Sequence, residues 1–163
     1  RIGCVMTEKT ESQVLDSAAD AAEFDHELYS QVTVAARLRD IKLIKSDYSI
    51  KPEVFEALDD LENMGFFGEP TGLFFNHDEG VLLGNYQWTC EVKLGRKKVL
   101  KFVCEYMVAY SGLDDFEEEY VRFYFEKVGR FATYPYFRSD FSHHASSSGI
   151  FLPPLPSLNE RVN

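Results

Sequence analysis

The stretch YQWTCEVKLGRKKVLKFVCEYMVAY, from Tyr86 to Tyr110, decides the fold. Up to Leu94, apolar side chains alternate strictly with polar ones, and this period of two is typical of a strand with one buried and one wet face. The alternation returns at Leu100, after a turn that begins at Gly95. Two such runs joined by a short glycine-containing turn predict a long antiparallel hairpin.

The segment just before the hairpin is rich in glycine and phenylalanine. Between Gly65 and Gly84, glycine supplies turns while aromatic rings supply apolar surface. This mixture suits a mobile apolar loop or a strand edge, and equally well a set of rings that fill the core. The apolar side chains concerned are Phe66, Phe67, Leu73, Phe74 and Phe75.

Three elements are predicted nearer the N-terminus. Residues 11–36 lack proline and glycine and repeat apolar residues every four positions, which predicts a helical arm. Residues 37–50 favour a strand over a continued helix because Pro52 follows them. Pro52 suits the first turn of a short helix that ends near Gly65. Residues 1–10 are expected to be disordered or a non-native leader.

Two helices are predicted after the hairpin. An aspartate at 114 or 115 is expected to cap a helix that runs to about Val128, before Gly129. A second helix, from about Phe131 to Ser147, must start or kink at Pro135. The proline-rich tail that follows is expected to be extended.

Composition limits the class of protein. The chain has 163 residues, 45% of them hydrophobic, which fits one domain with a substantial core. Its net charge of -10 excludes a typical nucleic-acid binder, which needs clustered basic residues. No run approaches the roughly 20 apolar residues of a membrane span, and the start has no secretion-signal layout. A soluble cytoplasmic protein is therefore expected.

Residues with reactive side chains form no recognisable catalytic motif. Cys4, Cys90 and Cys104 lack CxxC spacing, which predicts reduced, buried thiols. The neighbours His143 and His144 would point about 100° apart on a helix, which predicts a polar surface and no metal site. Nucleotide-binding and hydrolase motifs are missing from the sequence. These features predict a protein that is not an enzyme and that uses no cofactor.

A recognisable arrangement lies near the C-terminus. The run Tyr134-Pro135-Tyr136-Phe137-Arg138 precedes Gly149 and the segment Leu152-Pro153-Pro154-Leu155-Pro156. In order and spacing this arrangement resembles the end of SecB-family export chaperones, and the strand around Cys104 resembles a strand of that family. The resemblance covers about Arg37 to Leu158. Arg138, among rings, predicts a structural clamp in preference to an anion site.

The resemblance implies a fold and a function. The fold is α+β, with an antiparallel four-stranded sheet packed with helices, assembled as a dimer or a dimer of dimers. The function is an ATP-independent holdase that binds unfolded polypeptide clients, with a groove formed partly by the loop between the first two strands, about Pro52 to Gly84. The candidate client-contacting residues are Phe66, Phe67, Leu73, Phe74, Phe75, Trp88, Phe151 and Leu152.

The chain then divides into an N-terminal helical arm (1–36), a SecB-like domain (37–158) and a short tail (159–163). Family members continue into a further helix and an acidic tail that help to bind clients and the translocation motor. The motor is thus a possible partner here, although little sequence follows Leu158. The helical arm is a candidate cover for the groove.

Two rival interpretations remain open. One is a small α+β enzyme or ligand-binding barrel with a closed pocket under Trp88 and Phe102. The other is a dedicated chaperone of a single partner, like the SecB-like chaperones that serve toxin-antitoxin pairs.

Overall fold

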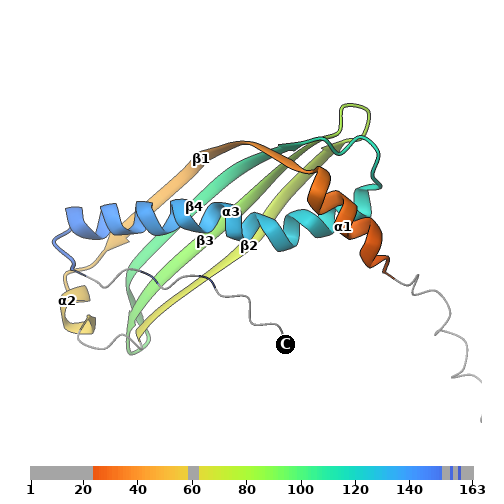
Figure 1. Ribbon diagram of the computed structural model, residues 1–163. Helices are drawn as coiled ribbons and strands as arrows, with labels where there is room; N and C mark the ends of the chain where they lie inside the picture. The colour runs from red at the N-terminus through yellow and green to blue at the C-terminus, as the bar shows by residue number, and fades with distance from the viewer. Residues whose placement is uncertain (1–23, 59–62, 152–154, 156–157, 159–163) are drawn as a thin grey trace, which may run out of the picture.

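The computed structural model describes residues 24–58, 63–151, 155 and 158. In chain order it contains α1 (His26–Ala35), β1 (Arg37–Ile50), α2 (Val54–Ala57), β2 (Met64–Asn76), β3 (Val81–Leu94), β4 (Lys97–Ser111) and α3 (Glu118–Ser147). The strands form one sheet, and the long helix α3 crosses one of its faces (Figure 1). The predicted α+β fold class is confirmed.

The sheet has the order β1-β4-β3-β2, with every neighbouring pair antiparallel. The predicted hairpin forms β3 and β4, with Trp88 opposite Cys104 and Tyr86 opposite Tyr106. Gly95 adopts a φ of 61° in the turn between them, a conformation that glycine adopts without strain. The predicted strand at 37–50 is also confirmed as β1. Because β1 and β2 are the outer strands, each has one side without a partner strand in the described protomer.

The glycine- and phenylalanine-rich segment is mostly strand, so the prediction of a loop from Pro52 to Gly84 was wrong. Only residues 51–63 connect the first two strands, and β2 begins at Met64. Its register shifts by one residue between Pro70 and Gly72. A shift of one residue exchanges the two faces of a strand. The side chains that face α3 are therefore Phe66 before the shift and Leu73 and Phe75 after it.

Helix α3 is a single helix of 30 residues, so the prediction of two helices with a break near Gly129 was wrong. Gly129 and Pro135 both lie inside it, and it begins after Glu117 instead of at residue 114 or 115. Its buried residues from Val121 to Ala145 pack on one continuous sheet. This packing outweighs the local cost of glycine and proline, since tertiary contacts supply most of the stability of a helix.

The core between α3 and the sheet is aromatic. Trp88 stacks on Phe137 with ring centroids 5.5 Å apart, and its indole N–H donates a 2.8 Å hydrogen bond to the Thr133 hydroxyl. Thr133 in turn donates to the carbonyl oxygen of Gly129. Cys90 and Cys104 are buried, free thiols, as predicted. Cys4 lies outside the described residues.

Helix α1 packs on the N-terminal half of α3 (Figure 1). The Asp25 side chain caps it by accepting hydrogen bonds from the backbone N–H groups of Glu27 and Leu28. Ring contacts of 4.6 and 5.1 Å join Phe24 and Tyr29 to Phe123 of α3. The rest of the predicted arm lies outside the described residues. Within the described part of the chain, no helix combines the length and apolar character needed to cross a membrane.

Candidate functional site

Strand β2 combines an open backbone edge with exposed rings. Phe67 and Phe74 lie on the face away from α3 and are 54% and 62% exposed. On the other face, Phe66 and Leu73 are half-buried. An edge strand of this kind can pair with an extended polypeptide through its backbone, while its side chains supply apolar contacts.

Two hollows border β2. The first, about 370 Å³, lies between residues 63–67 and the end of β3 at Glu91 and Lys93. The second, about 240 Å³, lies between residues 70–73 and α3, where Phe125 forms part of its wall. Both hollows adjoin the candidate residues of β2 and offer space for apolar side chains of a bound segment.

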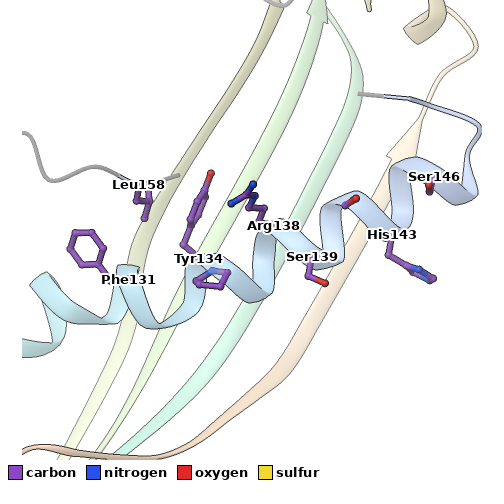
Figure 2. A pocket seen from close by; sticks show the side chains of 9 residues that line it. Phe131, Tyr134, Arg138, Ser139, His143, Ser146 and Leu158 are labelled. Carbon is purple, nitrogen blue, oxygen red and sulfur yellow. The ribbon is translucent and has the colours of Figure 1, made fainter. Parts of the chain in front are cut away.

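Tyr134 connects β2 to a larger hollow of about 700 Å³ along the C-terminal half of α3 (Figure 2). Its ring stacks on Phe66 with centroids 5.8 Å apart. The rest of the apolar wall consists of Phe131, Pro135 and Leu158. The polar lining residues are Arg138, Ser139, Ser142, His143 and Ser146.

The other predicted client-contacting residues have different surroundings. Trp88 is only 2% exposed beneath α3, so it cannot touch a client without opening the core. Phe151, which follows the end of α3 in the chain, is 88% exposed. Leu152, with Pro153 and Pro154, lies outside the described residues. The rival enzyme or ligand-binding interpretation expected a closed pocket under Trp88 and Phe102. Stacked rings, including Phe137, fill this space.

The C-terminal motif that begins at Tyr134 lies partly in the core and partly on the surface. Tyr134 is buried, whereas Pro135 and Tyr136 are exposed on the outer side of α3. Gly149 follows the helix with a φ of 71°, as expected for a helix-ending glycine. Arg138 was predicted to be a structural clamp, but within the described residues this half-buried guanidinium has no hydrogen bond or ion pair.

The ionisable groups of the core serve packing. Burial raises the pKa of Cys90 to about 12 and that of Cys104 to about 11, so both thiols are protonated at neutral pH. Burial, together with a hydrogen bond donated to Asp140, raises the pKa of Tyr106 above its usual range. Among the residues that the structure describes, no three His, Cys, Asp or Glu side chains group as metal ligands would.

The two neighbouring histidines differ. His143 is exposed, as predicted, but His144 lies half-buried between α3 and β1. Its ring stacks on Tyr48 with centroids 4.9 Å apart, and Nε2 lies 3.5 Å from the Ser46 hydroxyl oxygen. His144 therefore helps to hold β1 against the helix and does not belong to a polar surface.

The sequence interpretation missed a second apolar surface, at the opposite edge of the sheet. Leu38, Leu43 and Ile50 of β1 pair with inward-facing residues of β4 but remain 50%, 48% and 36% exposed. They are uncovered because α3 packs mainly over the other strands. The signal was available, since these residues are apolar in a segment already favoured as a strand.

Comparison with known proteins supports the fold. No protein-family model matches the sequence, and no curated protein matches it significantly. The structure is similar to the Mycobacterium tuberculosis Rv1957 SecB-like chaperone, solved in complex with a ChAD peptide from Rv1956 HigA1 antitoxin. The TM-score is 0.65 at 17% identity, over 83% of this chain and 99% of that chain. A protein of unknown function from Streptococcus agalactiae covers 76% of this chain and 96% of its own at 10% identity, with a TM-score of 0.35 that supports no argument. The SecB-like fold implied by the sequence resemblance is confirmed.

Proposed function

We propose that this protomer, which has a SecB-like fold, is a chaperone that binds non-native polypeptide without ATP along β2 and the adjoining part of α3. The observation that carries the proposal is an open edge strand with exposed Phe67 and Phe74, bordered by hollows. A protein of the same fold was solved with a bound peptide, which supports a polypeptide ligand.

The binding mechanism combines backbone pairing with apolar burial. Backbone hydrogen bonds at a strand edge do not depend on the client's side chains, so they tolerate many sequences. Phe67 and Phe74 are each about half exposed, and burying the remainder contributes about 1 to 2 kcal/mol per ring. The net charge of -10 opposes non-specific association between the exposed β2 surfaces of different copies.

Assembly into a homo-oligomer, a dimer or a dimer of dimers, is part of the same proposal. The β1 edge supports it, because Leu38, Leu43 and Ile50 form an uncovered apolar surface beside unpaired backbone groups. The free thiols of Cys90 and Cys104 are consistent with a reducing compartment, and we place the protein in the cytoplasm. Coupling to export through a translocation motor rests on the sequence resemblance alone.

A dedicated chaperone of one partner is the second candidate function. The observation that favours it is the antitoxin peptide bound by the Mycobacterium tuberculosis protein of the same fold.

Aggregation assays separate these functions. Several unrelated proteins are unfolded chemically and then diluted into solutions that contain the wild-type protein, the Phe67→Ser/Phe74→Ser variant or the control variant Tyr136→Ser. The control changes an exposed ring on α3. Because the double variant loses two ring contacts, the concentration of it that suppresses aggregation should be about tenfold or more above that of wild type. The control variant should behave as wild type. Solution mass is measured in parallel. Suppression of one client only would favour the dedicated chaperone, and a monomer that suppresses none would refute the proposal.

A further inference from the structure

The hollow beside the C-terminal half of α3 has a lining unlike the rest of the protein. The chain carries 27 acidic residues, yet none of the nine described residues that line this hollow is acidic. Its volume of about 700 Å³ falls within the range of roughly 300 to 1,000 Å³ that is typical of ligand sites. In an acidic protein, a hollow whose described lining carries no negative side chain suits a ligand with negative charge.

The arrangement of the lining indicates which kind of anion fits. Arg138 extends toward Leu158 on the same side of α3 as Tyr134, whereas His143 points to the other side (Figure 2). Leu158, Tyr134 and Phe131 make this side of the hollow apolar. Ser142, one helical turn beyond Arg138, adds a hydroxyl donor to the lining. One guanidinium among apolar groups suits a singly charged ligand with an apolar body.

Arg138 is also available for such a ligand. It is half-buried and, in the part of the chain that the structure describes, makes no hydrogen bond or ion pair. A guanidinium presents five donors, and its planar fork matches the two oxygens of a carboxylate. Phosphate groups carry more charge and would be repelled more strongly by the net charge of -10.

We propose that this hollow binds client segments in which a carboxylate lies next to apolar side chains, with Arg138 pairing to the carboxylate. The inference rests on the proposed chaperone function and adds to it a preference among clients. The apolar wall, joined to β2 through the stacking of Tyr134 on Phe66, receives the neighbouring apolar side chains. Backbone pairing at β2 alone would give no such preference.

The test uses two apolar peptides, blocked at both ends, that are identical except for Asp or Asn at one central position. Calorimetric titration at physiological ionic strength should show that wild type binds the Asp peptide about tenfold or more tightly than the Asn peptide. In Arg138→Met the ratio should fall to about one, with binding of the Asn peptide unchanged. Arg138→Lys should keep part of the preference because it keeps the charge but loses the planar fork.

The matched control is Lys127→Met, which removes one positive charge from the same helix, outside the lining of the hollow. It should retain the full preference for the Asp peptide. Equal binding of both peptides by wild type, or a preference that survives in Arg138→Met, would overturn the inference and leave the proposed function intact. The wild-type comparison decides the matter even if Arg138→Met does not fold.

Decanoate is a further ligand to titrate, because a fatty acid also carries one carboxylate on an apolar chain. Arg138-dependent binding of decanoate without any preference between the peptides would assign the hollow to a free fatty acid and overturn the client assignment. Failure to bind either peptide, together with failure to suppress aggregation, would refute both proposals.

Discussion

Replacing Gly84 by alanine tests how closely α3 approaches the sheet. A Cβ atom at this position of β3 would lie 2.3 Å from Cζ of Phe125, a fully buried residue of α3. Ordinary van der Waals contact begins at 3.4 Å. The difference between 3.4 and 2.3 Å requires the ring or the helix to retreat by about 1.1 Å.

Toward Gly129 and Tyr86, Phe125 has little room for this displacement. Its ring already lies against Gly129, where an added Cβ would be only 3.0 Å away, and it contacts Tyr86 at 6.3 Å between centroids. Overpacking a tight core costs about 1 to 3 kcal/mol. In a domain of this size, each kcal/mol lowers Tm by about 2 to 4 °C, so we expect Gly84→Ala to lower Tm by about 2 to 12 °C.

Urea unfolding, followed by the fluorescence of Trp88, the single tryptophan, measures the free energy of unfolding at a fixed protein concentration. The matched control is Gly65→Ala, since nothing lies within 4 Å of a Cβ added there. It should be neutral or stabilising by up to about 1 kcal/mol. In a Phe125→Leu background, Gly84→Ala should cost less than in wild type. Equal stability of the Gly84→Ala and Gly65→Ala variants would refute the close contact between α3 and β3.

Three further substitutions test the core. Thr133→Val leaves the buried indole N–H of Trp88 without its acceptor and should cost about 1 to 3 kcal/mol in urea unfolding; wild-type stability would contradict the hydrogen bond. Tyr48→Phe should be neutral or stabilising, because the buried Tyr48 hydroxyl has no partner among the described residues; a loss above about 1 kcal/mol would be inconsistent with this. Burial raises the thiol pKa of Cys104 to about 11 and that of Cys90 to about 12, from an ordinary value near 9. The contribution of the buried, protonated thiols to the free energy of unfolding is therefore complete below pH 9 and is lost as the pH rises through 11 and 12. The urea midpoint of wild type should therefore fall more steeply above pH 9 than that of the Cys90→Ala/Cys104→Ala variant.

Local periodicity in the sequence predicted the parts of the fold that depend on local pattern. Uninterrupted alternation identified β3 and β4, and the residues before Pro52 identified β1. Alternation in β2 was hidden because its glycines carry no side chain and because the register shift at Thr71 exchanges its faces. Helix α3 was divided in two because local rules for Gly129 and Pro135 cannot include the sheet beneath them.

The candidate site was predictable in composition but not in geometry. The sequence identified Phe67 and Phe74 as apolar, but only pairing with β3 shows that both lie on the face away from α3. Trp88 belongs to the buried face of an alternating strand, so its pattern already argued against client contact. The lack of a hydrogen bond or ion pair for Arg138 among the described residues depends on contacts across the fold, which no local pattern reports.

If the proposed chaperone pairs along β1, the opposite positions of β1 and β2 in the sheet would set a length scale for its clients. Two copies joined along β1 would form eight strands with a β2 at each margin. Seven intervals of about 4.8 Å place these margins about 34 Å apart, a distance that about ten residues of extended chain can span. The length of chain between two apolar segments of a client, as much as their composition, would then determine how tightly the client binds.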